Sequence, residues 1–123
     1  MSVRVRPAGC NERADAFEAD CDNATVTVPG LMVPLSYVFD HVLPASASQR
    51  DLFDSVAAPI ARGTLDGFNG TILTYGQTGS GKSFTCFGEG DGEARGLVPR
   101  TLEFVFAHLA AKASVINCNV LLS

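Results

Sequence analysis

The chain has 123 residues, of which 46% are hydrophobic and 18% charged, so its length allows one small domain or part of a larger one and excludes two independent domains. Thirteen acidic residues against nine basic ones give a formal net charge of −4, which argues against nucleic acid as a partner. The sequence contains no run of 18 apolar residues and no apolar signal-peptide core, so we expect neither a membrane partner nor secretion.

The four cysteines indicate a reducing compartment. Cys10, Cys21, Cys86 and Cys118 are far apart and form no C-x-x-C pair. This spacing predicts neither a zinc site nor a disulfide framework. We therefore expect reduced thiols in a cytosolic protein.

Alternating apolar and polar residues predict short strands in the first third of the chain. The three alternating segments are 3–5, 24–28 and 35–39. A proline follows the first two, at Pro7 and Pro29, and stops them as strands. The polar stretch 8–22 and the glycine-rich stretch 88–96 predict loops.

Two helices are predicted from apolar residues at helical spacing. The first runs from about Ser48 to Leu65, and Ser46 stands three residues before Gln49 as in a capping box. The second follows Pro99, which suits a first helical turn, and its apolar residues are 102, 105, 106 and 109.

The continuous apolar run Thr71–Tyr75 predicts a buried strand, and Val115–Leu122 predicts another strand. Strands that alternate with helices favour the α/β class, with a mostly parallel sheet covered by helices on both faces. The last predicted strand ends at Ser123 with an open edge. We therefore expect a chain that is truncated at its C-terminus.

The main chemical motif spans eight residues between a predicted strand and a predicted helix. They are, in order, Gly76, Gln77, Thr78, Gly79, Ser80, Gly81, Lys82 and Ser83. This order satisfies the phosphate-loop pattern G-x-x-x-x-G-K-[ST] in full, in the strand, loop and helix context that the pattern requires. A glycine turn without a ligand is the alternative, and chance gives such a match in about one chain in 250.

The residue types of this loop suit a magnesium nucleoside triphosphate. Gly76, Gly79 and Gly81 allow successive backbone N–H groups to converge on phosphate oxygens. Lys82 supplies a point charge for the outer phosphates, and the Ser83 hydroxyl is a hard oxygen ligand for Mg²⁺. The loop residues thus predict a nucleoside triphosphate with Mg²⁺ as the ligand, with all eight loop residues as the binding site and Ser83 as the metal ligand.

Hydrolysis requires further groups that orient the attacking water and hold the metal. No D-x-x-G sequence follows an apolar strand, and no serine-rich switch segment follows the loop. We therefore assign no catalytic residue within the chain.

The sequence around the loop resembles that of kinesin motor domains. The run Gly67-Phe68-Asn69-Gly70-Thr71 that leads into Tyr75-Gly76-Gln77-Thr78-Gly79-Ser80-Gly81-Lys82 is similar to a hallmark of that family. Four weaker similarities occur in the family's order, at residues 4–7, 37–40, 96–100 and 119–123. The resemblance therefore spans nearly the whole chain.

The resemblance implies a phosphate-loop NTPase fold, a three-layer α/β/α arrangement that is incomplete here. By the same resemblance, Arg4, Arg6 and Pro7 would border the adenine and Phe84 would pack against it, although a solvated strand end and simple core burial are the alternatives. The family usually has Thr where Ser83 stands, which keeps the hydroxyl, and commonly Met where Cys86 stands.

A kinesin motor is about three times as long as this chain, so the resemblance implies the N-terminal part of a motor domain, clipped at both ends. The family's two switches and most of its microtubule-contacting surface would lie beyond Ser123. The implied parent is a microtubule-stimulated ATPase of the cytoplasm and cytoskeleton, and the chain alone would be inactive. A nucleotide-binding module without motor activity is the alternative, and another class of phosphate-loop enzyme is a weaker one.

Overall fold

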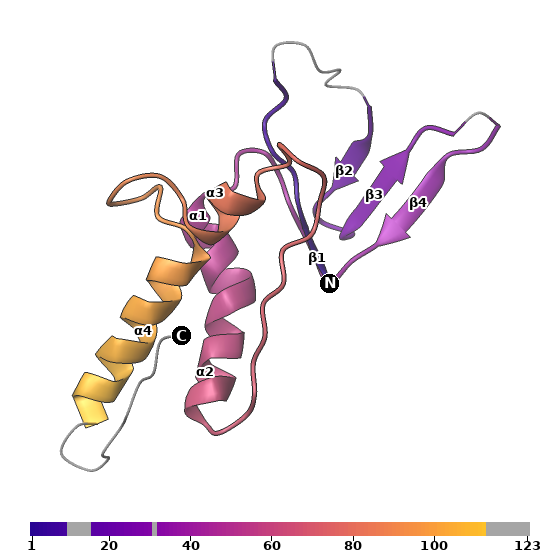
Figure 1. Cartoon of the computed structure of the whole chain (residues 1–123). Coiled ribbons are helices and arrows are strands. Elements are labelled where there is room, and N and C mark those ends of the chain that lie inside the picture. The colour runs from indigo at the N-terminus through magenta and orange to yellow at the C-terminus, as the bar shows by residue number, and fades with distance from the viewer. Residues whose placement is uncertain (10–15, 31, 113–123) are drawn as a thin grey trace. The chain divides into compact units, whose positions relative to one another are not determined.

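The computed structural model describes residues 1–9, 16–30 and 32–112. These residues form two compact units (Figure 1). The first contains Met1–Ser48 together with Thr78–Gly81, and the second contains Gln49–Gln77 and the chain from Lys82 onward. Each unit buries apolar side chains of its own.

A pair of parallel strands contributes the buried side chains of the first unit. β1 (Ser2–Arg4) pairs with β5 (His41–Leu43), and Val3 lies opposite Val42. Val42 and the neighbouring Leu43 are buried. The strand predicted at residues 3–5 is confirmed, shifted by one residue. β5 is missed because its apolar residues, Val42 and Leu43, are adjacent and do not alternate with polar ones.

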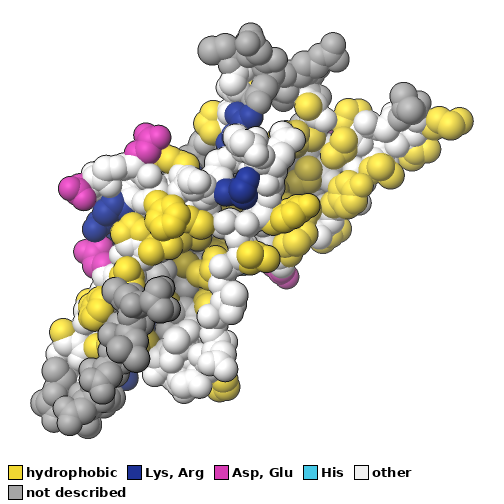
Figure 2. All heavy atoms as spheres, in the orientation of Figure 1, with side chains coloured by type: hydrophobic (Ala, Val, Ile, Leu, Met, Phe, Trp, Pro, Cys, Tyr) yellow, Lys and Arg dark blue, Asp and Glu magenta, His cyan; other side chains and the backbone are white. Residues whose placement is uncertain are grey.

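A three-stranded antiparallel sheet completes the first unit. Its strands are, in spatial order, β2 (Glu18–Asp20), β3 (Thr25–Val28) and β4 (Leu35–Val38). β3 and β4 confirm two predicted strands, but β2 lies in the polar stretch for which a loop was expected. Apolar side chains reach the surface along this hairpin (Figure 2), namely Val28, Met32, Val33, Leu35, Tyr37 and Val38.

The second unit begins with one continuous helical segment, which confirms the helix predicted from Ser48 to Leu65. It consists of α1 (Gln49–Leu52), a π-helical turn η1 (Phe53–Ala57) and α2 (Ala58–Leu65). Pro59 has no N–H to donate, and its ring would meet the carbonyl four residues earlier, so a wider turn just before it accommodates the proline. The segment begins at Gln49, which leaves Ser46 outside the helix and does not support the expected capping box.

Gly67 ends this helix with a left-handed turn. Its φ is +95°, and its N–H donates to the Thr64 carbonyl at 3.1 Å while the N–H of Phe68 donates to the Gly63 carbonyl at 2.9 Å. These two bonds form a Schellman motif, which satisfies carbonyls that the helix end leaves free. The Schellman motif therefore explains why glycine stands at position 67, the first residue of the Gly67-Phe68-Asn69-Gly70 run.

The second helix, α4 (Leu97–Lys112), lies beside α2 (Figure 1) and confirms the helix predicted around Pro99. Phe53 and Phe104 join the two helical segments edge to face, with ring centroids 5.9 Å apart and an interplanar angle of 62°. The guanidinium of Arg62 lies 5.8 Å from the centre of the Phe104 ring, within range of a cation–π contact. Aromatic packing of this kind fixes α4 against the first helix.

The run Thr71–Tyr75, which predicts a buried strand, forms no strand among the described residues. It is extended between α2 and the next helix (Figure 1), with Leu73 85% exposed and Tyr75 97% exposed. A strand needs a neighbour that accepts and donates its backbone hydrogen bonds, and no described segment pairs with this one. The expectation of burial is therefore wrong for the described part of the chain.

The described part is a partial α/β fold with a parallel strand pair, as expected for an incomplete form of the predicted architecture. The predicted strand Val115–Leu122 lies outside the described residues. No helix within residues 1–9, 16–30 and 32–112 is long and apolar enough to cross a membrane. Of the cysteines, Cys21 and Cys86 are free thiols, and Cys10 and Cys118 lie outside the described ranges.

Candidate functional site

The eight residues of the predicted phosphate loop connect the extended run to a short helix. Gly76 to Gly81 have irregular backbone, and Lys82 and Ser83 are the first two residues of α3 (Lys82–Cys86). The loop and helix therefore follow each other in the predicted order. Of the two compact units, the first contains Thr78–Gly81 and the second contains the remaining loop residues.

Glycine is required at the turns of this loop because of backbone conformation. Gly79 and Gly81 have φ values of +80° and +92°, where a residue with a Cβ is strained. A Cβ built on either glycine would have no atom within 4 Å. Space next to the backbone is therefore open, which fits a loop that lets an anion approach its N–H groups.

The ammonium group of Lys82 folds back onto the start of the loop. Its Nζ donates to the Gly76 carbonyl and to the Gln77 carbonyl, at 2.7 Å in both cases. The side chain is half-buried, and its charge stays beside the residues that the motif assigns to phosphate. An ammonium carries three donors, so this placement leaves capacity for an anionic oxygen.

Ser83 is exposed and lies next to Lys82 in the sequence. Its hydroxyl is a hard oxygen ligand of the kind that Mg²⁺ uses together with nucleotide phosphates. No group of three His, Cys, Asp or Glu within the described ranges could hold a metal ion. A single hydroxyl oxygen would fit a Mg²⁺ that takes its other ligands from phosphate and water.

The residues expected around an adenine are divided between the two units. Arg4, Arg6 and Pro7 belong to the first unit and Phe84 to the second. Arg4 ends β1 and is half-buried, and this burial lowers the pKa of its guanidinium. Arg6 donates from Nη1 to the Pro7 carbonyl at 3.1 Å, and Phe84 is 37% exposed in α3. The adenine assignment remains a prediction for all four residues.

Two buried polar side chains of the second unit are not identified by sequence patterns. Gln49 is 3% exposed and Arg100 is 6% exposed. The Gln49 amide nitrogen donates to the Phe84 carbonyl of α3 at 2.6 Å, whereas the sequence suggests a local capping role for this residue. The Gln49 contact joins residues 35 positions apart, so no local motif signals it.

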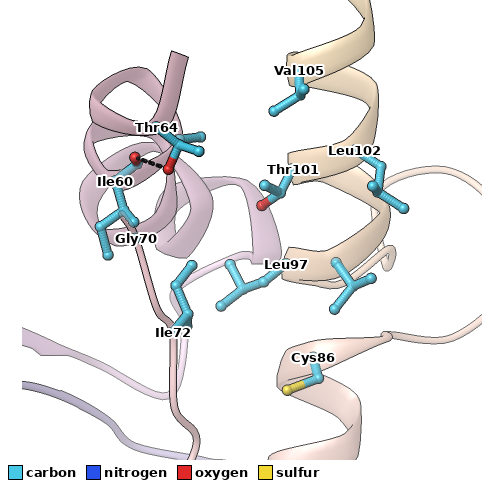
Figure 3. A pocket seen from close by; sticks show the side chains of 11 residues that line it. Ile60, Thr64, Gly70, Ile72, Cys86, Leu97, Thr101, Leu102 and Val105 are labelled. Atoms are coloured by element: carbon cyan, nitrogen blue, oxygen red, sulfur yellow. Dashed lines mark hydrogen bonds between the residues drawn. The ribbon is translucent and has the colours of Figure 1, made fainter. Parts of the chain in front are cut away.

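An apolar cavity of about 340 Å³ lies in the second unit, between α2, α4, α3 and the extended run (Figure 3). Ile60 and Thr64 face it from α2, and Leu102 and Val105 face it from α4. The Thr64 hydroxyl donates to the Ile60 carbonyl at 3.1 Å and is thereby satisfied. Because no charged residue lines the cavity, it is unsuited to phosphate.

The chain has clear relatives among known proteins. A family model described as the kinesin motor domain matches residues 4–123. The chain is 43% identical over 93 residues to kinesin-related protein 3 of Dictyostelium discoideum, covering 72% of the chain and 8% of that protein. It is 37% identical over 130 residues to kinesin-like protein KIN-UA of Arabidopsis thaliana, covering 98% of the chain and 14% of that protein.

A solved structure has a similar fold. It is described as a fast kinesin, with implications for its ATPase mechanism and its interactions with microtubules, and it matches 89% of this chain with a TM-score of 0.77 and 34% identity. The match covers 32% of that structure's chain, so the present chain spans a minor part of the proteins it resembles. From the family model and these similarities, the chain belongs to the kinesin motor-domain family.

Proposed function

We propose that residues 1–123 form the N-terminal part of a motor domain and bind ATP with Mg²⁺ through the loop from Gly76 to Ser83. The observation that carries this proposal is the position of the Lys82 ammonium, which is 2.7 Å from two carbonyl oxygens at the start of a complete phosphate-loop motif. The left-handed glycines at positions 79 and 81 support it, since the space beside their backbone is open and a loop of this kind lets an anion approach its N–H groups.

Each part of the loop has a separate role in this proposal. The backbone N–H groups from Gln77 to Gly81 surround the phosphates, and Lys82 neutralises charge on the outer ones. Ser83 contributes one oxygen to the Mg²⁺, whose chemistry when bound is to neutralise charge on the phosphate oxygens. The chain thereby binds the nucleotide and holds its phosphates in one orientation.

A second part of the proposal concerns the activity of the whole parent protein. We infer that the parent protein is an ATPase that moves along microtubules in the cytoplasm, which membership of the kinesin family supports. The 123 residues contain neither the N-x-x-S-S-R-S-H nor the D-L-A-G-S-E sequence of the family's switches. For this chain alone we therefore propose nucleotide binding without microtubule-stimulated turnover. The alternative is a nucleotide-binding module that is not part of a motor.

Titration with a fluorescent ATP analogue, with and without Mg²⁺, tests nucleotide binding. We expect saturable, Mg²⁺-dependent binding that Lys82→Ala weakens by at least tenfold. Lys112→Ala is the matched control, because Lys112 is the other lysine of the chain and lies at the end of α4. Absence of binding by the folded chain, or equal loss in both variants, would overturn the proposed site.

Microtubule-stimulated phosphate release then tests whether the chain alone can turn over ATP in response to microtubules. The chain is expected to release phosphate at the same rate with and without microtubules. Clear stimulation would show that the 123 residues contain switching groups other than the family's two switch sequences.

A further inference from the structure

Gln49 connects the first helical segment to the short helix that follows the phosphate loop. Its side chain is 3% exposed, and its amide nitrogen donates to the Phe84 carbonyl at 2.6 Å and to the Ala94 carbonyl at 3.4 Å. Gln49, Phe84 and Ala94 all belong to the second unit. One buried side chain therefore contacts both α3 and the loop that follows it.

The contact with Phe84 acts on a helix that has little support of its own. α3 contains five residues and begins with Lys82 and Ser83. A helix this short is marginal in water and depends on tertiary contacts. Phe84 directly follows Ser83, so a hydrogen bond that fixes its carbonyl also limits how the two proposed phosphate and metal contacts can move.

A second buried side chain holds the loop from Phe87 to Gly96 beside this helix. Arg100 donates from Nη2 to the Glu93 carbonyl at 2.8 Å and from Nε to the Arg95 carbonyl at 2.9 Å. Together with the Gln49 contact, three successive carbonyls of the loop accept hydrogen bonds from buried side chains. The loop is thereby fixed against α1, which carries Gln49, and against α4, which carries Arg100.

Glycines allow this loop to close tightly on α3. A Cβ on Gly88 would lie 2.0 Å from the Ala94 carbonyl oxygen, and one on Gly96 would lie 2.5 Å from the Cys86 carbonyl. Backbone therefore meets backbone at both ends of the loop, with no space for a side chain. Because the loop lies this close to α3, the Gln49 amide can contact a carbonyl of the helix and a carbonyl of the loop at once.

We propose that Gln49 is a positioning residue for nucleotide binding, which holds α3 so that Lys82 and Ser83 are presented to the phosphates. This inference rests on the proposed function, and it adds a residue outside the phosphate-loop motif. Gln49 acts through the backbone of Phe84 and touches neither the nucleotide nor the metal.

The variant Gln49→Glu gives the proposal a pH-dependent test. A neutral carboxyl can still donate one hydrogen bond to the Phe84 carbonyl, whereas a carboxylate accepts only and repels both carbonyl oxygens. We expect the fluorescent ATP analogue to bind at least tenfold more weakly to this variant than to the wild type at pH 8, and within about threefold of the wild type at pH 5.5.

Two further variants provide the controls. Gln49→Leu keeps the size without a donor and is expected to weaken binding at both pH values. Ala111→Glu introduces one carboxyl at an exposed position of α4 and should bind like the wild type throughout. The wild type at each pH accounts for titration of the nucleotide. Glu93 and Arg95 in the loop, Arg100 on α4 and Cys86 on α3 are the charged and thiol groups next to these contacts, and they are the same in every variant.

Hydrogen exchange without nucleotide separates this inference from the proposed function. We expect Gln49→Leu to speed amide exchange at least tenfold in residues 84–96 and to leave the β3–β4 hairpin unchanged. If the wild type binds no nucleotide, the proposed function fails, and exchange still reports whether Gln49 holds α3. Unchanged exchange in residues 84–96, or equal nucleotide affinity in Gln49→Glu and wild type at pH 8, would overturn the role of Gln49.

Discussion

The Nζ atom of Lys82 donates to the carbonyl of Gly76, six residues earlier in the chain, at 2.7 Å. The same atom donates to the Gln77 carbonyl at the same distance. A single nitrogen that serves two neighbouring carbonyls needs donors that diverge from one point, which an ammonium has. The loop is thus suited to the shape of a lysine side chain as well as to its charge.

The first prediction is that arginine cannot replace Lys82. A guanidinium is a planar fork rather than a compact point charge, so it cannot make both short contacts in the same space. We expect Lys82→Arg to lose at least tenfold in affinity for Mg²⁺ and ATP although the net charge is unchanged. Thermal unfolding checks this result, because saturating ligand at 100 times its Kd stabilises the native state by about 2.7 kcal/mol.

The wild type should therefore show a larger ligand-induced shift in its unfolding midpoint than Lys82→Arg, which a tenfold higher Kd leaves with a stabilisation of about 1.4 kcal/mol or less at the same ligand concentration. Unfolding without ligand should be similar in the two proteins, which excludes a folding defect. A full ligand-induced shift in Lys82→Arg would mean that charge alone accounts for the role of this residue.

The second prediction concerns Gly63, which lies inside α2, and Gly67, which lies just after its end. Substitution by alanine should change the stability of the chain in opposite directions at these two positions. Gly67 has a φ of +95°, so Gly67→Ala places a Cβ in a left-handed turn and should destabilise the chain by about 1 to 2 kcal/mol. Gly63 lies inside α2, and a Cβ there has no atom within 4 Å. Gly63→Ala should therefore stabilise the chain by about 0.5 to 1 kcal/mol through helix propensity.

Urea unfolding of both variants measures these two changes in the free energy of unfolding. The comparison removes the general effect of a glycine-to-alanine change, because both substitutions add one methyl group within five positions of each other. Destabilisation by both variants to the same extent would show that the left-handed turn is not what requires glycine at position 67.

Helices could be predicted from the sequence more fully than strands, for physical reasons. The segment from Gln49 to Leu65 and α4 are long enough for apolar residues to repeat on one face. β2 has a single apolar residue, Ala19, and the two apolar residues of β5 are adjacent, so neither strand repeats an apolar residue at every second position. The run Thr71–Tyr75 has the composition of a buried strand, but a strand also needs a paired neighbour, which composition does not encode.

The candidate site could be predicted in part. The order of residues from Gly76 to Ser83 identifies the loop and its proposed ligand, because a phosphate cradle needs those residue types at that local spacing. The contacts of Gln49 could not be predicted in this way. They join residues 35 and 45 positions apart in the sequence, and only tertiary packing brings them together.

The third prediction concerns the pH dependence of the turn between β2 and β3. Asn23 donates to Asp20 from its side-chain nitrogen at 2.7 Å and from its backbone nitrogen at 2.9 Å. The side-chain bond first, and the backbone bond second, lower the pKa of Asp20 below its ordinary value of 3.8. Because the folded pKa is the lower one, the carboxylate stabilises the fold at pH values above 3.8, and this contribution is lost as the pH falls through the lowered value.

We expect Asn23→Ala to raise the pKa of Asp20 toward its ordinary value, because it removes the largest cause of the shift. NMR titration of the side-chain carboxyl carbons measures the change. Asp40 is the internal control, since a hydrogen bond and charge attraction from the N-terminal amine lower its pKa instead. A shift of Asp40 together with Asp20 would indicate a general change in the first unit rather than loss of the local bond.

The fourth prediction is that the extended run before the phosphate loop drives self-association of the chain. Leu73 is 85% exposed and Tyr75 is 97% exposed, and exposed apolar segments with unpaired backbone pair readily with other chains. Leu73→Lys should lower the sedimentation coefficient at high protein concentration, because a charge on an exposed strand edge opposes pairing. Met32→Lys is the matched control, since Met32 is 95% exposed but lies in the hairpin between β3 and β4.

Both lysine variants change the formal net charge from −4 to −3, which by itself favours association. Weaker association in Leu73→Lys therefore cannot come from net charge and must come from the run that carries the substitution. If Met32→Lys reduced association as much as Leu73→Lys, apolar exposure in general, rather than the extended run Thr71–Tyr75, would be the cause.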